Sequence, residues 1–471
     1  MYSARVRFLA HRHILASRWQ ADFDRVAVLG NDSQGHQGCV NALSWANDQL
    51  LLSGSDDRTY GYSSWKYAPT NTEQVSKSGQ WIRPSQIPQT IPSYLVPPST
   101  RDTEPTYSTF TVCHIRVACM SASVGGDGEV QVHEFEAPHA CTHVLRCHEN
   151  RTKRICTEES PHLFLTVAED GSVRQHDLRM SHSCYRGGCP PPLLSVDFEL
   201  STLSLSPLTP YQFVVAGESE YGLLFDRRQA GRFLLAERGA VENGMTYCVR
   251  RFGRPTTRPE GEPRLSLRRE HITGSRMSAA NGHQLLLSYS GDAVYLYSTL
   301  DPVDADDMRR SVRDQDEEMS EESRDAYSRV PTVQPQRRYR GARNVATVKD
   351  VNFLGPNDDF VASGSDCGNL FIWNKETGEL HALLEGDATT VNVIEGHPSL
   401  PLFACSGIDE TIKLFAPVSC GRPSAFSRMD QAGRILAGNA RPSMGFLQRH
   451  HFAALLARLD VEDAETECNH Q

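Results

Sequence analysis

The sequence predicts an all-β fold, a ring of seven four-stranded sheets known as a β-propeller, and three observations support this prediction. A short motif of Gly, Ser and Asp recurs seven times, each time after an apolar run, as at a tight turn between two strands. Three of the gaps between successive motifs, at 42 to 49 residues, match the length of one propeller blade. A closed ring also leaves few exposed sheet edges, so the architecture is consistent with itself.

Four copies of the motif are clear and three are weaker. The clear copies lie at residues 52–59, 167–173, 362–367 and 405–411, and the weaker ones at 125–128, 216–219 and 288–291. Aligned on the turn, the copies fall at positions 57, 127, 170, 219, 291, 367 and 409. Seven copies predict seven blades, and we expect the propeller to span residues 29–417.

The three longer gaps are expected to contain insertions, at about residues 66–110, 229–280 and 300–337. The first is rich in Pro, Ser and Thr, whereas residues 249–270 are rich in Arg and Pro and residues 301–325 are dense in charged side chains. Such compositions bury little apolar surface, so we expect solvated loops. The arginines between 250 and 269 have two interpretations: a solvated loop that balances the acidic insertion, or a surface for nucleic acid or an acidic protein.

The two end segments, residues 1–28 and 418–471, lie outside the predicted blades. Apolar positions between Arg5 and Trp19 predict a short N-terminal amphipathic helix, and those between Phe446 and Leu459 predict a helical C-terminal tail. Each helix is either a cap packed on the propeller or an element that docks into a groove of a partner.

Composition narrows the class of function. The net charge of -10 argues against a protein whose main task is to bind nucleic-acid phosphates. Arginines interrupt the N-terminal apolar residues, and no apolar run is long enough for a membrane helix, so we expect neither a secretory signal nor a membrane span. The 13 cysteines show no framework spacing, which indicates reduced thiols in the nucleus or cytoplasm.

We expect no catalytic residue, cofactor or metal. The sequence contains no Gly-x-Ser-x-Gly elbow, phosphate-binding loop or His-Glu-x-x-His motif. Four possible zinc ligands, Cys141, His143, Cys147 and His148, lie close together in the sequence, with Cys184 and Cys189 further along. Their spacing matches no common zinc knuckle.

The type of repeat is indicated by the residues that flank the turns. Gly35-His36 precedes the first turn, and Phe371-Ile372-Trp373 and Lys413-Leu414-Phe415 end two later copies. This pattern resembles the WD-repeat family, whose blades open near Gly-His and close near Trp-Asp. The resemblance implies structural roles within the blades for a set of residues that hydrogen-bond there. These residues are His36, Asp57, Asp127, Asp170, Trp373 and Asp409.

A narrower resemblance rests on longer stretches of sequence. The stretches are residues 35–45 with 53–57, then 344–345, 351–356, 363–368, 384–387, 391–392, 397–401, 406–409 and 415–417. Their order resembles the cullin-4-associated WD-repeat substrate receptors, in the group of associated factors 5, 6 and 8 and the WD-and-tetratricopeptide-repeat protein. It covers residues 29–65, 120–228 and 338–417, a little under half of the chain. The chain departs from the family where blade one ends in Tyr60-Gly61-Tyr62-Ser63 instead of Leu-x-Ile-Trp.

The resemblance implies a site for the ligase adaptor, damaged-DNA-binding protein 1, which recognises a Trp-Asp-x-Arg motif in such receptors. Here His176-Asp177-Leu178-Arg179 and Phe225-Asp226-Arg227-Arg228 keep Asp and Arg at that spacing and replace Trp by another ring. An Arg offers a planar head with several donors, and a neighbouring Asp holds it in position. The alternative is that both aspartates only cap strand ends and both arginines are solvated.

We therefore expect a non-enzymatic substrate receptor of a cullin-4 RING ubiquitin ligase, located in the nucleus, the cytoplasm or both. Its expected partners are the adaptor with its cullin-4 assembly and a protein substrate, with no nucleic acid and no membrane. The alternative function is a WD-repeat scaffold of a chromatin or transcription-regulating complex without a ligase role.

Overall fold

A computed structural model describes the greater part of the chain. The described residues are 18–30, 35–46, 50–57, 60–64, 93–96, 111–115, 120–134, 141–157, 160, 162–180, 183–184, 188–229, 248–255, 265, 269–303, 327, 330, 332–418 and 424–442. They form seven sheets, which we number in chain order by their first strand, except that the sheet containing both ends of the ring is sheet 7.

Sheets 1 to 3 each contain four antiparallel strands that follow one another along the chain. Sheet 1 contains β2 (Val40–Trp45), β3 (Leu50–Ser55), β4 (Tyr60–Ser64) and β5 (Ser93–Val96). Sheet 2 contains β6 (Thr111–Ile115), β7 (Met120–Val124), β8 (Val130–Glu134) and β9 (Cys141–Leu145). Sheet 3 contains β10 (Thr152–Thr157), β11 (Leu163–Ala168), β12 (Ser172–Asp177) and β13 (Leu194–Ser195).

Sheets 4 to 6 continue this order with one addition, a fifth strand that pairs in parallel with the edge of sheet 4. Sheet 4 contains β14 (Leu200–Leu205), β15 (Gln212–Gly217), β16 (Gly222–Asp226), β17 (Cys248–Phe252) and the added β21 (Thr332–Val333). Sheet 5 contains β18 (Ile272–Met277), β19 (Gln284–Tyr289), β20 (Val294–Ser298) and β22 (Arg337–Tyr339). Sheet 6 contains β23 (Val351–Leu354), β24 (Phe360–Ser363), β25 (Asn369–Asn374) and β26 (Leu380–Glu385).

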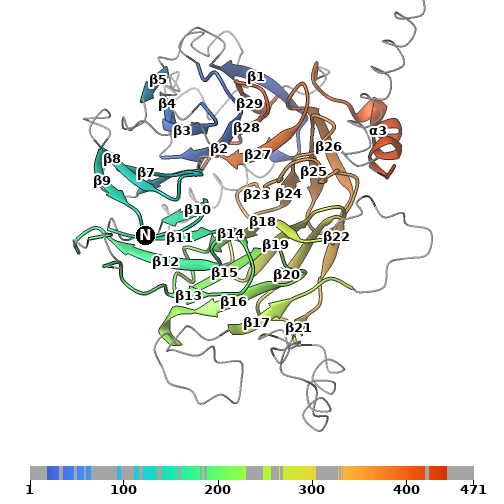
Figure 1. Cartoon of the computed structure of the whole chain (residues 1–471). Helices are drawn as coiled ribbons and strands as arrows, with labels where there is room; N and C mark the ends of the chain where they lie inside the picture. Colours follow the sequence, from blue (N-terminus) through green and yellow to red (C-terminus); the bar gives the residue numbers. More distant parts are fainter. Residues whose placement is uncertain are drawn as a thin grey trace, which may run out of the picture.

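Sheet 7 joins the two ends of the ring. It contains β27 (Val391–Gly396), β28 (Phe403–Gly407), β29 (Ile412–Pro417) and, as its outer strand, β1 (Phe23–Leu29). The antiparallel pairing of β1 with β29 runs from Phe23 opposite Pro417 to Leu29 opposite Ile412. Hydrogen bonds between the beginning and the end of the propeller therefore close the ring, as the adjacent blue β1 and orange β29 of Figure 1 show.

The seven sheets form a closed circle. The first strand of each sheet contacts the first strand of the next, and β27 of sheet 7 contacts β2 of sheet 1 (Figure 1). The apolar core lies between neighbouring sheets, and every residue of β16, β20 and β29 is buried. The all-β propeller predicted from the repeats is confirmed.

All seven predicted turns join the second and third strands of their sheets. In four of them, Gly128, Gly171, Gly291 and Gly368 have φ angles of 70° to 76°, a region that strains residues with a side chain. A Cβ on Gly171 would also lie 2.3 Å from the carbonyl oxygen of Val196. The motif recurs because each turn needs a residue without a side chain or a short polar one.

The ring has two distinct ends, which we call the base and the top. The base holds the loops between the first and second strands and the final residues of the third strands, and the top holds the seven turns. Hydrogen bonds join the base of neighbouring sheets: Ser206 Oγ donates to the carbonyl of Ser278 at 2.9 Å, and Thr209 Oγ1 donates to that of Gly282 at 3.1 Å.

The structure corrects the boundaries of all three predicted insertions, because each range contains strands that complete a sheet. Residues 66–110 include β5, residues 229–280 include β17 and all of β18, and residues 300–337 include β21 and the first residue of β22. Outer strands pair along one edge only and carry weak apolar alternation, so composition alone assigned them to loops.

The boundaries of the end segments also change. Residues 23–28, which the sequence placed before the propeller, belong to β1. Trp19 lies in the apolar core at 4% exposure, 5.2 Å from Phe23 between ring centroids. The predicted helices lie outside the described residues, except for residues 18 and 19 at the end of the first.

The described part of the tail contains the 3-10 turn η6 (Met429–Gln431) and the helix α3 (Ala432–Asn439). This helix packs against sheet 6 through Ala432, Ile435 and Leu436, and Asn439 Nδ2 donates to the carbonyl of Gly341 at 2.7 Å. This part of the tail is thus a cap on the propeller. Within the described residues, no helix has the length and apolar character needed to cross a bilayer.

Candidate protein-binding site at the base of the ring

The first predicted Asp-Arg pair lies where β12 ends. The backbone N–H and Nε of Arg179 donate to Oδ1 of Asp177 at 3.0 and 2.9 Å, and Nη2 donates to Oδ2 at 2.7 Å. These hydrogen bonds lower the pKa of Asp177 to about 2, so the carboxylate stays ionised at any physiological pH. The Arg179 side chain is 60% exposed, so the pair presents a held cation to solvent.

The second pair repeats this arrangement where β16 ends, in the neighbouring sheet. Arg228 donates from its backbone N–H and Nε to Oδ1 of Asp226, both at 3.0 Å, and from Nη2 to Oδ2 at 2.5 Å. These bonds lower the pKa of Asp226 despite the burial of its carboxylate. The guanidinium also lies 3.6 Å from the centre of the Tyr211 ring and is 62% exposed.

A third arginine connects the two pairs. Arg227, on the 3-10 turn η3 (Arg227–Gln229), donates from Nη1 to Oε1 of Gln175 on β12 at 3.3 Å and from Nη2 to the carbonyl of Pro210. Sheets 3 and 4 are thus tied together beside the pairs. Gln175, Tyr211 and Arg227 were missed in the sequence because their partners are distant in the chain. Arg227 meets Gln175 across sheets 4 and 3, and Tyr211 meets Arg228 within sheet 4.

The next two sheets carry different residues at the equivalent positions. Sheet 5 has Ser298 and the exposed Leu300, and sheet 6 has Asn374 and the exposed Glu376. Asn374 accepts the backbone N–H of Glu376 at 3.0 Å, as Asp177 and Asp226 accept the backbone N–H of their arginines. The local turn is therefore the same in sheet 6, but it carries no cation. Among sheets 3 to 6, a held arginine occurs on sheets 3 and 4.

A cavity of about 470 Å³ opens at the base between sheets 5, 6 and 7. It is lined by the first loop of each of these sheets and by Trp19. The main side chains around it are Trp19, Arg276, Phe353, Pro356, His397 and Leu400. Trp19 therefore brings the N-terminal segment to the end of the ring that carries the two Asp-Arg pairs.

Some of the predicted structural residues form hydrogen-bonded groups within their sheets. In sheet 1, His36 contacts Asp57 Oδ2 through Nδ1 at 3.1 Å and Ser53 Oγ through Nε2 at 2.8 Å. In sheet 3, His148 Nδ1 lies 3.1 Å from Asp170 Oδ2, and Thr166 Oγ1 lies 2.7 Å from His148 Nε2.

His176 completes the group in sheet 3, with Nε2 2.8 Å from Thr166 Oγ1. It occupies the place in its strand that Trp373 has in sheet 6. Although burial by itself raises the pKa of Asp170, hydrogen bonds from His148 and Ser172 lower it overall. The sequence indicated Asp170 but not this complete group, because Cys147-His148 stands where the family has Gly-His.

The remaining predicted residues have other partners. Asp127 accepts the backbone N–H of Glu129 at 3.0 Å, and Asp409 accepts Lys413 Nζ at 2.9 Å. Trp373 is 1% exposed, and its Nε1 donates to the carbonyl of Arg340 at 3.1 Å. Its indole therefore contributes mainly to the apolar core beside Phe371 and Tyr339.

The described arginines of the basic run pack against the propeller. Arg251 Nε donates to Thr332 Oγ1 at 2.9 Å, Arg254 Nη2 to Glu270 Oε2 at 2.9 Å, and Arg269 Nε to Glu220 Oε1 at 3.0 Å. Arg250 Nη1 donates to the carbonyl of Asp301 at 2.5 Å. These contacts with the propeller's own residues show that the described part of the run is not simply a solvated loop.

Comparison with known proteins identifies the type of repeat. The model of the WD domain, G-beta repeat, matches residues 27–60 and 334–374, which correspond to parts of sheets 1, 5, 6 and 7. The chain contains WD repeats. The propeller described above is therefore a WD-repeat propeller, as its turns and flanking residues predicted.

Three curated proteins illustrate its similarities. The "WD repeat protein iqw1" of Schizosaccharomyces pombe is 47% identical over 98 residues, which are 20% of this chain and 12% of that protein. The human "DDB1- and CUL4-associated factor 6" is 48% identical over 85 residues, 18% of this chain and 10% of the relative. The mouse "WD and tetratricopeptide repeats protein 1" is 42% identical over 100 residues, with shares of 21% and 14%. Each match thus covers a small part of a longer relative.

Proposed function

We propose that this WD-repeat propeller is a substrate receptor of a cullin-4 RING ubiquitin ligase. In this proposal the adaptor, damaged-DNA-binding protein 1, binds the base of the ring at sheets 3 and 4. The observation that carries the proposal is the pair of exposed arginines, Arg179 and Arg228, each held by an aspartate at the same position of neighbouring sheets. The similarity to a DDB1- and CUL4-associated factor supports the choice of partner.

The physical argument is preorganisation. An exposed arginine loses rotamer freedom when a partner immobilises it, at a cost of about 0.5–1.5 kcal/mol for each such side chain. Asp177 and Asp226 already restrict their arginines, and the Tyr211 ring further restricts Arg228. A partner with carboxylates or carbonyls at matching positions would gain bidentate hydrogen bonds at a reduced ordering cost.

The N-terminal segment has a place in the same interface. Trp19, near the start of the described chain, is buried at the base, the end of the ring that carries the two pairs. We propose that residues 1–17 form a second contact with the adaptor, and that other surfaces of the ring bind a protein substrate. The receptor would catalyse no step itself but would raise the effective concentration of substrate near the ubiquitin-loaded enzyme, in the nucleus, the cytoplasm or both.

The test is a binding measurement between the full chain and the purified adaptor. Changing Arg179→Ala and Arg228→Ala together is expected to weaken binding about 100-fold or more, because two charge-assisted contacts are lost. The matched control changes Arg146→Ala and Arg269→Ala, which removes the same charge from two arginines paired with carboxylates at the top of the ring. Binding that survives the first pair of changes unaltered would contradict the assigned site.

Hydrogen exchange locates the interface independently. Adaptor binding is expected to slow amide exchange at residues 177–180 and 226–229 while leaving the top turn at residues 290–293 unchanged. If the unmodified chain does not bind the adaptor at all, the ligase proposal fails and a WD-repeat scaffold in a chromatin or transcription-regulating complex becomes the better hypothesis.

A further inference from the structure

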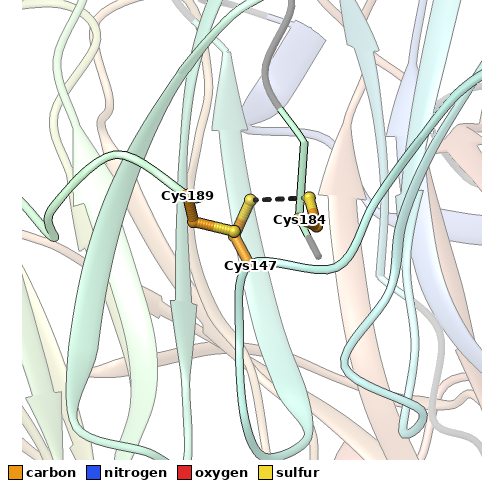
Figure 2. A group of neighbouring side chains, drawn as sticks. All are labelled: Cys147, Cys184 and Cys189. Atoms are coloured by element: carbon orange, nitrogen blue, oxygen red, sulfur yellow. Dashed lines mark hydrogen bonds between the residues drawn. The ribbon is translucent and has the colours of Figure 1, made fainter. Parts of the chain in front are cut away.

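Three cysteines that are distant in the sequence meet at the edge of sheet 3. Cys147 lies in the connection from β9 to β10, and Cys184 and Cys189 lie in the connection from β12 to β13. Their three sulfur atoms all lie within 4.8 Å of one another, and those of Cys147 and Cys184 are 3.7 Å apart. Figure 2 shows the three side chains directed toward a common point.

The spacing of the sulfur atoms fits a thiolate-bound cation. A disulfide has an S–S bond of about 2.05 Å, far shorter than the 3.7 Å between Cys147 and Cys184. Tetrahedral zinc with Zn–S bonds of about 2.3 Å places two thiolates about 3.8 Å apart. Three soft sulfur donors also select zinc or another thiophilic metal over magnesium or calcium.

The surroundings supply donors and positive charge. The backbone N–H of Arg146 donates to Cys184 Sγ at 3.3 Å, a bond that is stronger when the sulfur is a thiolate. Arg174 lies near Cys189, where its charge acts to lower the pKa of that thiol, and its Nη1 donates to the carbonyl of Pro190 at 2.8 Å. The Arg174 bond holds the chain beside Cys189 against β12.

A cross-link at this place has a structural purpose. The fourth strand of sheet 3, β13, has two residues and pairs only with Ser172 and Val173 of β12. The described residues of the long connection before it make few backbone hydrogen bonds to the sheet. A metal shared by Cys147, Cys184 and Cys189 would fasten this connection to the chain segment that begins sheet 3.

We propose that Cys147, Cys184 and Cys189 bind Zn²⁺ through three thiolates, with the fourth coordination position open to water. Binding releases three protons, one from each thiol, and forms three Zn–S bonds without any change of oxidation state. The resulting site carries one net negative charge, which the nearby Arg174 guanidinium offsets. The proposal departs from the expectation, based on the spacing of the cysteines and histidines, that the chain binds no metal.

Without a metal the three thiols are mostly protonated at neutral pH, because a free cysteine has a pKa of about 8.5. Zinc must displace those protons, and its affinity should therefore fall as the pH falls. The release of protons and the pH dependence of zinc affinity both follow from these three side chains, and neither depends on whether the chain binds a ligase adaptor.

The test measures metal content and thermal stability of the full chain, purified under reducing conditions with zinc supplied and then dialysed. We expect about one zinc per chain by inductively coupled plasma mass spectrometry. The Tm should fall when a strong chelator is added and recover when zinc is supplied again. Replacement by Co²⁺ should give the charge-transfer absorption of thiolate coordination.

Variants distinguish this site from other cysteines. Changing Cys147, Cys184 and Cys189 together to Ser should remove the zinc and the response of Tm to chelator. Because Cys147 is buried, the single Cys184→Ser and Cys189→Ser variants, made at partly exposed positions, serve if the triple variant does not fold. The matched controls, Cys248→Ser and Cys367→Ser, should keep the metal.

Three results would overturn the proposal. One is a reduced, folded chain that retains no zinc after dialysis. Another is zinc that persists when the three cysteines are replaced. The third is a Cys147–Cys184 disulfide in the reduced preparation, identified by peptide mapping, because the two sulfurs would then be unavailable to a metal.

Discussion

At the scale of single residues, the hydrogen-bonded group in sheet 3 has a definite direction. The Asp170 carboxylate only accepts, so His148 donates to it from Nδ1 and accepts at Nε2 from the hydroxyl of Thr166. The Thr166 oxygen then accepts from Nε2 of His176. One threonine hydroxyl therefore satisfies two buried histidines.

Thr166→Val should remove both bonds at nearly constant volume. Each of the two imidazole nitrogens left buried without a partner costs about 1–3 kcal/mol, so we expect a loss of roughly 2–6 kcal/mol in the free energy of unfolding. The control is Thr390→Val, since the hydroxyl of Thr390 is buried without a hydrogen bond in the described structure and its removal should be neutral or stabilising. Urea unfolding measures both variants, and equal effects would refute the assignment.

His133 makes stability depend on pH. Burial lowers its pKa from 6.5 to about 4, so the folded chain holds it neutral while the unfolded chain takes up a proton as the pH falls below 6.5. Stability is therefore greatest above pH 6.5, declines between 6.5 and about 4, and levels off below that. The full difference corresponds to roughly 3 kcal/mol.

His133→Phe should reduce this decline, and Phe suits the site because Phe225 occupies the equivalent position in sheet 4. The control is His143→Phe, at an exposed position of the same sheet. Unfolding free energies at pH 7.5 and pH 5 should differ less for His133→Phe than for the unmodified chain or the control. A decline of equal size in all three proteins would show that other groups cause it.

At the scale of elements, β1 and Trp19, four residues before it, stabilise the whole ring. Trp19 and Phe23 pack with Phe360 and Phe403, joining the N-terminal segment to sheets 6 and 7. Asp24 Oδ1 accepts Ser424 Oγ at 3.0 Å, so the tail also contacts this strand. The sequence left the N-terminal segment as either a cap or a docking element, and the structure shows that its residues from Trp19 to the end of β1 belong to the propeller.

Two truncations separate these roles. Removing residues 1–29 deletes Trp19, Phe23 and β1 and leaves the outer edge of β29 without a partner strand. The loss of two buried aromatic side chains costs about 3–5 kcal/mol each, so we expect unfolding or aggregation. Removing residues 1–17 should leave Tm nearly unchanged and weaken adaptor binding. Circular dichroism and the adaptor binding assay measure the outcome. A stable, well-folded protein without residues 1–29 would contradict the role given to β1.

At the scale of the whole molecule, ion pairs tie together sheets that are not neighbours. Arg154 on β10 pairs with Asp350 directly before β23, and Arg276 on β18 pairs with Glu395 on β27 at 2.9 Å. Glu395 also accepts Asn352 Nδ2 at 3.0 Å. These contacts connect sheet 3 with sheet 6 and sheet 5 with sheet 7.

Glu395→Gln should lower the free energy of unfolding by about 1 kcal/mol or less, because Arg276 is 42% exposed and solvent screens the pair. The loss should shrink at high salt, since screening weakens the original ion pair. The exposed Glu410→Gln is the control and should change little. An effect that is the same at low and high salt would indicate lost hydrogen bonds rather than lost charge.

The sequence by itself determined the propeller, the seven turns and the two Asp-Arg pairs. Each of these depends on residues close together in the chain, such as the turn glycines at positive φ or an aspartate two positions before its arginine. Such local geometry leaves a readable pattern.

Only the tertiary structure decided which distant residues meet. It placed β1 beside β29, Tyr211 under Arg228, His148 beside Thr166 and His176, and Cys147 beside Cys184 and Cys189. Outer strands such as β5 and β21 also became visible only through their pairing partners. The physical reason is that strand pairing within a sheet and packing between sheets bring together side chains separated by tens to hundreds of residues, and no spacing in the chain records those contacts.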